Sequence, residues 1–109
     1  MDERARERLQ DILDVAQELA GHLAGRDRAS FLADRGLQRI TERLLEIAGE
    51  AATHVPDDVA DGIGAGWKDL RGMRVLLAHA YHRILPERLW NATTRDLPRL
   101  AAAVQAHLQ

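Results

Sequence analysis

Arg74, His79 and Tyr81 lie close together in an otherwise apolar stretch, residues 74–81. A helix that packs through apolar contacts does not need such groups, so they are candidates for chemistry. Histidine can give or take a proton near neutral pH, and arginine offers a forked donor to phosphate oxygens. These groups could cleave RNA without a metal. A base would activate the ribose 2′-hydroxyl for attack on the neighbouring phosphorus, while the cation would hold the non-bridging oxygens.

The two side chains do not share one face of a straight helix, because Arg74 and His79 point about 140° apart. Either the arginine reaches round the helix, or the site combines residues of two subunits. The alternative without nuclease chemistry is a histidine that faces a partner and an arginine at the core edge that is bonded to a carboxylate such as Glu50.

Length and composition fit one globular domain over residues 1–109. The chain has no cysteine, which excludes disulfides and thiolate sites. No apolar stretch approaches the ~20 residues that span a bilayer. The charged beginning of the chain runs straight into a helical pattern, unlike a signal peptide. We therefore expect a cytoplasmic protein without a membrane partner.

Charge is distributed unevenly along the chain. Residues 1–66 hold 8 basic and 14 acidic side chains, whereas residues 67–100 hold 7 basic and 3 acidic ones. The segment around Arg74 is therefore locally basic in a protein of net charge −2. Such a segment can attract phosphates or an acidic partner. On charge alone, a solvated helix face that is balanced by the acidic half is the simpler interpretation.

Apolar spacing in the first half predicts two helices and a loop. Residues 2–24 repeat apolar side chains at three-and-four spacing. Ser30 is a good N-cap for a second helix, in which Gly36 marks a point of early bending or interruption and which Pro56 ends. Gly49 within it costs about 1 kcal/mol against alanine, which suggests close packing against a neighbour. Residues 56–66, with three glycines in five positions, are expected to form a loop.

The second half predicts further helices and no strand. A third helix is expected over residues 67–84, and Pro86 suits the first turn of a fourth. Pro98 either kinks that helix or opens a fifth. The expected fold is an all-α, antiparallel up-and-down bundle of four or five helices.

Both sides of the third helix are largely apolar. One side is expected to face the core and holds Trp67, Leu70, Met73, Leu77, Tyr81 and Ile84. The other holds Gly72, Val75, Leu76 and His79. A helix that is apolar nearly all round is buried nearly all round, and a small bundle cannot cover both sides alone. We therefore predict a homodimer with this helix in its interface and His79 at or near it.

The histidines of the chain are not spaced as a metal site would require. His79 and His82 stand three residues apart, a spacing that can pair on a metal, but no third ligand is evident nearby. The remaining three lie near expected helix ends, where surface or capping roles are the simpler interpretation: His22, His54 and His107. We therefore expect no bound metal.

The pattern Arg74-x4-His79-x-Tyr81 resembles the motif of the HepT family, the HEPN-domain ribonuclease toxins of HepT/MntA type VII toxin–antitoxin modules. Four further segments resemble that family in the same order along the chain: residues 31–34, 44–51 and 67–74, and Leu89-Trp90 followed by 96–100. The second reads Leu-Leu-Glu-Ile-Ala-Gly-Glu-Ala and the last Asp-Leu-Pro-Arg-Leu. A lone Arg-x4-His is weak evidence, but five matches in register are strong.

The resemblance implies a HEPN-like homodimer whose RNase sites form at the dimer interface, with Arg74 and His79 as the catalytic pair. It also implies a cognate antitoxin, MntA, a minimal nucleotidyltransferase that uses ATP and magnesium to transfer AMP to the motif tyrosine, here Tyr81. Bulky anionic groups beside the site would block an RNA phosphate. ATP belongs to that partner, so no cofactor is expected for this chain.

Val75 departs from the family's pattern, which usually has Asn or another polar residue directly after the motif arginine. An apolar side chain cannot orient a phosphate or a ribose hydroxyl. A catalytically weak or inactive HEPN dimer that serves as the binding partner of a nucleotidyltransferase is therefore the alternative function. A helical dimer without nucleotide chemistry is a third interpretation, which a buried Tyr81 and an Arg74 locked in an internal ion pair would favour.

Overall fold

The computed structural model describes residues 1–64, 66–79 and 85–109, apart from the side chain of His79. Its elements in chain order are α1 (Glu3–Leu23), α2 (Arg28–Leu32), α3 (Arg35–Thr53), α4 (Asp57–Ile63), α5 (Trp67–His79), α6 (Pro86–Asn91), the π-helix η2 (Ala92–Asp96) and α7 (Leu97–Leu108). The described residues contain no strand, so the all-α prediction is confirmed. They form more helices than the four or five expected, because short helices occupy two connections.

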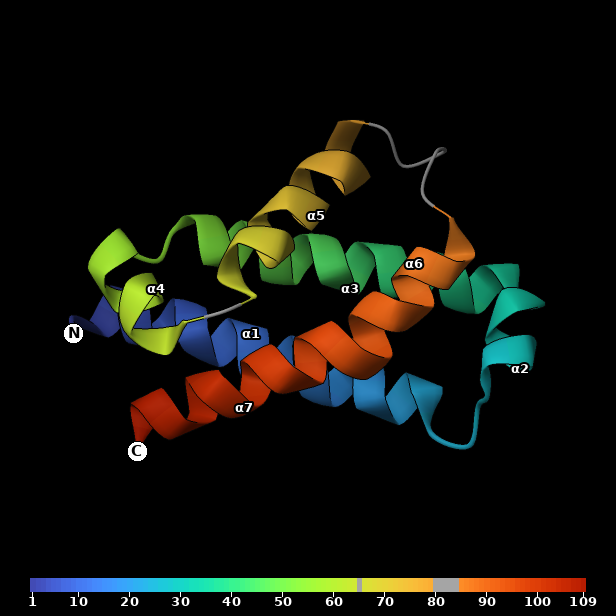
Figure 1. The fold of residues 1–109 in the computed structure, drawn as a ribbon, viewed down its shortest axis with the longest axis horizontal. Helices are drawn as coiled ribbons and strands as arrows, with labels where there is room; N and C mark the ends of the chain where they lie inside the picture. The colour runs from blue at the N-terminus through green and yellow to red at the C-terminus, as the bar shows by residue number, and fades with distance from the viewer. Residues whose placement is uncertain (65, 80–84) are drawn as a thin grey trace.

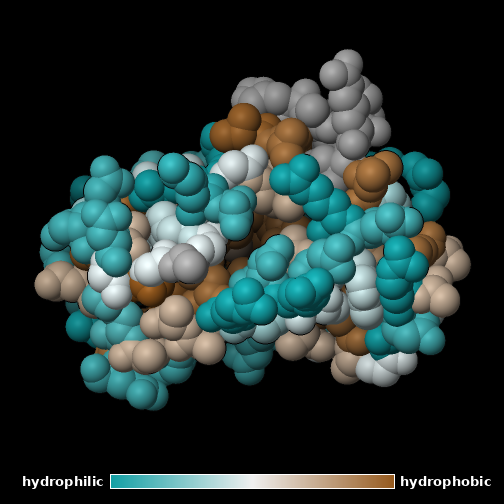
Figure 2. All heavy atoms as spheres, viewed as in Figure 1, coloured by the Kyte–Doolittle hydropathy of each residue, from teal (hydrophilic) through white to brown (hydrophobic). Residues whose placement is uncertain are grey.

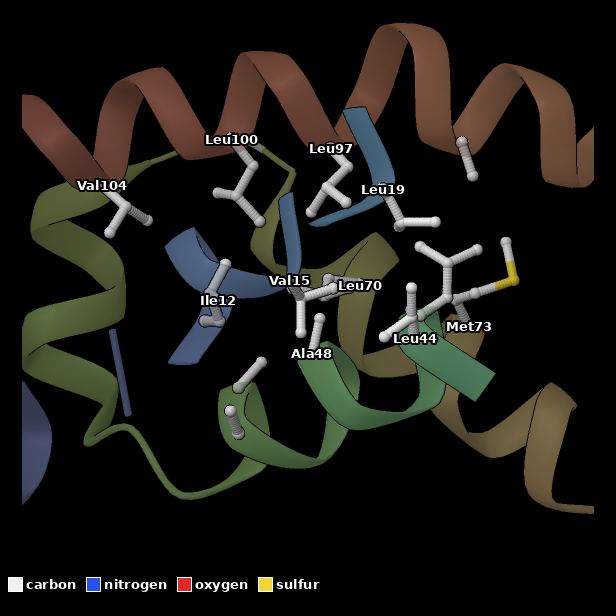
Figure 3. Close-up of a cluster of buried hydrophobic side chains, with 14 of the residues drawn as sticks. Ile12, Val15, Leu19, Leu44, Ala48, Leu70, Met73, Leu97, Leu100 and Val104 are labelled. Carbon is white, nitrogen blue, oxygen red and sulfur yellow. The ribbon is translucent and has the colours of Figure 1, made fainter. Parts of the chain in front are cut away.

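Four of these helices, α1, α3, α5 and α7, supply most of the core. In Figure 1, α1 and α3 run antiparallel, α7 passes across α1, and α5 packs against α3 and rises away from the bundle. Figure 3 shows side chains of α7 pointing toward those of α1, α3 and α5. These side chains are nearly all excluded from solvent, including Ile12, Ala48, Leu70, Leu97 and Val104. Burial of apolar surface is therefore what fixes α5 on α3.

The second expected helix is broken near its start, and Ser30 is not its N-cap. Asp27 caps the short α2, and Ser30 sits three residues on, completing a reciprocal capping box with it. The longer α3 then begins anew after Asp34, whose carboxylate accepts the Leu37 backbone N–H at 3.0 Å. Asp27 therefore moves the start of the helical segment to before Ser30, and Asp34 divides a segment that apolar spacing alone reads as continuous.

The prediction of a loop over residues 56–66 is wrong for most of its length, because α4 occupies it. Asp57 and Asp58 lie in the first turn of α4, where negative charge is favourable. Ala60 is buried, which fastens this helix to the core. The glycines act only after it: Gly64 ends α4 with φ 103°, a conformation that other residues rarely adopt.

Residues Pro86–Leu108 form one helical stretch in which Pro98 lies in the first turn of α7. A proline ring inside an α-helix would clash with the carbonyl four residues earlier. Here the π-helix η2 comes just before, and the Leu97 N–H reaches back to Ala92. The wider turn accommodates the ring, so the stretch continues past Pro98. The last part of the expected third helix, residues 80–84, lies outside the described residues.

Asp34 is expected to stabilise the fold through the start of α3. Asp34→Ala should lower Tm, because it removes the cap on Leu37 N–H and the ion pair with Arg26. Asp34→Asn should lower Tm less, since asparagine can still cap but cannot pair. Thermal unfolding followed by circular dichroism measures both. An equal loss for the two variants would contradict a role for the cap, and a wild-type Tm for Asp34→Asn would contradict a role for the ion pair.

The loss should also depend on pH. The Leu37 N–H, and then Arg26, hold the pKa of Asp34 below its ordinary 3.8. A carboxyl whose pKa is lower in the folded state stabilises that state above the unfolded pKa and loses the contribution as pH falls through the folded pKa. The Tm difference between wild type and Asp34→Ala should therefore be full at neutral pH and shrink below about pH 3.8.

Candidate active site

Arg74 lies where α5 crosses α3, directly against Gly49. A Cβ built on Gly49 would be 2.3 Å from the Arg74 Cβ and 3.1 Å from the Leu70 carbonyl oxygen. No side chain fits that gap, because non-bonded carbons are normally at least about 3.5 Å apart. The predicted close approach at Gly49 is therefore confirmed, and it sets where the Arg74 side chain leaves α5.

The two sides of α5 differ in burial as the helical periodicity predicts. Its core side is almost fully buried through Trp67, Leu70, Met73 and Leu77. On the opposite side Gly72 is exposed, Leu76 is half-buried, and Val75 keeps 52 % of its surface in solvent. Apolar atoms are visible around the upper part of α5 in Figure 2. An exposed apolar side of this kind is what the predicted dimer interface requires.

Arg74 and His54 both contact the carboxylate of Glu50. Arg74 Nη2 lies 2.7 Å from Glu50 Oε2, and His54 Nε2 lies 3.0 Å from Glu50 Oε1. The His54 hydrogen bond, followed by the Arg74 charge, holds the pKa of Glu50 below its ordinary value. Glu50 is therefore ionised at neutral pH and presents a full negative charge to the guanidinium.

This ion pair is the contact expected if Arg74 had no part in nuclease chemistry, but it does not enclose the arginine. The Arg74 side chain remains 35 % exposed. A guanidinium has five N–H donors, and the contact with Glu50 involves Nη2. Arg74 can therefore keep this carboxylate and still offer donors to a phosphate.

Arg71, one turn earlier, has a structural position. Its guanidinium donates to the carbonyl oxygens of Ala52 at 3.0 Å and Val55 at 2.8 Å, and reaches Asp57 at 3.3 Å. It also lies over the Trp67 ring, 5.8 Å from the centroid. Arg71 thus satisfies the carbonyls at the end of α3 and links α4 to α5.

The structure places only part of the predicted site. His79 is the last residue of α5, and its side chain is not among the described atoms. Tyr81 and His82 lie outside the described residues. Within the described part of the chain, no group of three or more His, Asp or Glu side chains could hold a metal. Likewise, no described helix is long and apolar enough to cross a membrane.

His54 is the residue of this cluster that sequence reasoning left out. It caps the end of α3, as expected for a histidine near a helix end. Its contact with Glu50 was not anticipated, although the signal was present: residues four apart on a helix are neighbours, and Glu50 and His54 have that spacing. The Arg74–Glu50 pair was anticipated, but only as the alternative to catalysis.

Comparison with known proteins agrees with the motif. The family model described as "Ribonuclease HepT-like" matches residues 12–107. A protein of Caldanaerobacter subterraneus subsp. tengcongensis, "Putative RNase TTE0752", is 30% identical over 93% of this chain and 91% of its own. "Putative RNase MJ1380" of Methanocaldococcus jannaschii is 29% identical over 89% and 90%. "Probable ribonuclease HepT" of Thermococcus cleftensis is 30% identical over 86% and 84%.

No solved structure gives a significant match. The family model nevertheless covers α3 and α5 in full, the two helices that meet at Gly49 and Arg74. The three relatives are matched over 84% to 91% of their own length. The chain belongs to the HepT-like ribonuclease family.

Proposed function

We propose that the protein is the toxin of a type VII toxin–antitoxin module, a metal-independent endoribonuclease that acts as a HEPN-like homodimer. Arg74 and His79 are its catalytic pair. The observation that carries the proposal is the placement of Arg74: half-exposed and held by Glu50, beside an apolar side of α5 that a second copy can cover. Membership of a ribonuclease family supports the same chemistry.

In the proposed reaction, His79 takes the proton from a ribose 2′-hydroxyl. The 2′-oxygen attacks the adjacent phosphorus, the bond to the 5′-oxygen breaks, and the products are a 2′,3′-cyclic phosphate and a 5′-hydroxyl that receives a proton. Arg74 donates to the non-bridging oxygens, where negative charge builds up. Because Arg74 points away from the direction of His79 on a straight helix, each site would combine the arginine of one subunit with the histidine of the other.

The proposed control is adenylylation of Tyr81 by an MntA-like nucleotidyltransferase antitoxin, with the ATP and magnesium supplied by that partner. Tyr81 stands two residues after His79, so an attached AMP would bring a phosphate close to the site. Its negative charge would compete with an RNA phosphate for Arg74. The chain would then be neutralised without being degraded.

A second candidate is a catalytically weak or inactive dimer that partners the nucleotidyltransferase. The exposure of Val75 favours it, because the residue after the arginine lies at the surface and supplies no polar group to RNA. A stable complex with the nucleotidyltransferase and modification of Tyr81, in the absence of any RNase activity, would select this candidate.

Expression without an antitoxin tests the leading proposal. Wild type should inhibit growth, whereas His79→Ala should not, because general-base catalysis is lost. Purified wild type should cleave RNA in the presence of EDTA and leave 2′,3′-cyclic phosphate ends, detected by end-specific labelling. Equal growth of the two strains together with no cleavage by purified wild type would overturn the enzyme proposal.

A further inference from the structure

Glu50 is held on both of its oxygens by different residues. Arg74 Nη2 reaches Oε2 at 2.7 Å from the neighbouring helix, and His54 Nε2 reaches Oε1 at 3.0 Å from the next turn of α3. A carboxylate with one partner can rotate about its Cγ–Cδ bond and still keep that contact. With a partner on each oxygen its plane is fixed, and so is the direction of the charge that faces the guanidinium.

The backbone crossing makes this contact available. Gly49 lets α5 approach until the Arg74 Cβ touches α3, and Glu50 is the next residue along α3. The base of the Arg74 side chain is thus fixed by packing and its tip by Glu50. These two contacts restrict the rotamers of the long Arg74 side chain, which would otherwise lose much conformational entropy when it takes up one position.

The contacts of Glu50 with Arg74 and His54 are too exposed to contribute much to the stability of the fold. The side chains of Glu50 and Arg74 are 46 % and 35 % exposed, and that of His54 is 53 % exposed. Half-exposed ion pairs contribute little to the free energy of unfolding, since water and salt screen them. Stability therefore does not account for these three groups, which together hold one arginine in place.

Among the described residues, the other charged side chains that line the groove beside Glu50 already have partners. A groove between α1 and α3 is lined by Glu50 and by Arg8, Asp11, Arg43 and Glu46. Arg43 pairs with Glu46 at 3.6 Å, and Arg8 pairs with Asp11 at 3.8 Å. None of these pairs involves Glu50, so within the described part of the chain the charge of Glu50 faces Arg74 and His54.

We infer that Glu50 and His54 are positioning residues for RNA cleavage: Glu50 aims the Arg74 guanidinium at the phosphate, and His54 locks Glu50. This inference rests on the proposed ribonuclease function. Glu50 does not touch RNA in this scheme, and it acts only through Arg74.

Glu50→Gln tests the inference, because it keeps the size of the side chain and removes its charge. A loose guanidinium should lower kcat for RNA cleavage by about 10- to 100-fold with a smaller change in KM, as misplacement of a catalytic group by about 1 Å can cost 10²-fold. Glu46→Gln is the matched control one turn earlier on α3, and it should cleave as wild type does. Both variants should unfold at nearly the same temperature.

His54 supplies a rescue within the same assay. His54→Ala should lose part of the activity, whereas His54→Gln, which can still donate to Glu50, should keep more of it. In an Arg74→Ala background, Glu50→Gln should have no further effect, since the two residues act as a unit. If Glu50→Gln lowered the cleavage rate further in that background, the inference would be overturned, because Glu50 would then act independently of Arg74.

Arginine side-chain NMR separates this inference from the proposed function. In wild type, rotation about the guanidinium bonds of Arg74 should be slow, and Glu50→Gln should speed it. If wild type cleaves RNA and Glu50→Gln cleaves equally well, the inference fails while the function stands. If wild type does not cleave, the proposed function fails, and with it any role of Glu50 in cleavage. Unchanged Arg74 dynamics in Glu50→Gln would also contradict the positioning contact itself.

Discussion

Arg74→Ala is expected to lower the rate of RNA cleavage about 10²–10³-fold, the usual cost of removing one donor from a site where negative charge builds up. The fold should remain intact. Arg74 is 35 % exposed, and the Glu50 carboxylate that it leaves behind is 46 % exposed, so water can solvate that charge. Multiple-turnover kinetics on a defined RNA, together with thermal unfolding, measure the two effects separately.

Arg71→Ala is the matched control, one helical turn earlier with the same charge. It should do the opposite: destabilise the protein by about 1–3 kcal/mol while leaving the cleavage rate per folded molecule near that of wild type. The reason is that Arg71 donates to the carbonyls of Ala52 and Val55 at the end of α3. If Arg71→Ala and Arg74→Ala lost cleavage equally, local positive charge would explain the activity and a specific site would not.

Mixing impaired subunits tests whether the site is shared. Arg74→Ala and His79→Ala should each be strongly impaired, but a mixed dimer of the two would contain one site with both residues if each site combines two subunits. Co-refolding the variants should then restore a measurable part of the wild-type rate. No recovery, with mixed dimers detected by mass spectrometry, would place both residues of a site in one chain.

Burial on α5 could be predicted from the sequence because it depends on spacing alone. Trp67 and Leu77 are spaced by helical periodicity on the buried side, and Val75 falls on the exposed side. The same reasoning found Gly49, because a glycine inside a helix costs stability unless a neighbour needs the space. The burial pattern of α5 and the glycine at position 49 can each be read from the sequence because one physical effect dominates each of them.

The errors arose where short-range and long-range effects compete. Asp34 begins α3 inside a pattern that reads as one helix, and nothing in apolar spacing marks a polar cap as a break. Residues 56–66 look like a loop because of their glycines and aspartates, yet residues 57–63 are helical, with two aspartates in the favourable first turn and Ala60 buried in the core. The His54–Glu50 contact follows from spacing, but its relevance depends on Arg74, which reaches Glu50 only through the tertiary crossing.

Gly49→Ala is expected to destabilise the protein although alanine is the better helix former. The new methyl carbon would stand 2.3 Å from the Arg74 Cβ and 3.1 Å from the Leu70 carbonyl oxygen, so α3 and α5 must separate by more than about 1 Å. Overpacking of this kind costs about 1–3 kcal/mol. The gain in helix propensity, about 1 kcal/mol, matches only the lower end of this overpacking cost, so the variant should be less stable than wild type.

Gly21→Ala in α1 is the control that isolates this cause. A Cβ at Gly21 would meet nothing within 4 Å, so only the propensity gain remains and Tm should rise. Opposite signs for two chemically identical substitutions would show that contact between α3 and α5 decides the outcome. A Gly49→Ala protein as stable as wild type would contradict the crossing described for α3 and α5.

Gly49→Ala should also impair RNA cleavage when the rate is measured well below Tm, where the variant is fully folded. Moving α5 by about 1 Å moves the base of Arg74 away from Glu50, and a misplacement of that size can cost up to about 10²-fold in rate. Gly21→Ala should leave the rate unchanged, since α1 does not carry Arg74. A rate that falls only for Gly49→Ala would tie the activity to the crossing that places this arginine. A variant that is destabilised but cleaves normally would instead mean that Arg74 acts from a position other than the one packed against Gly49.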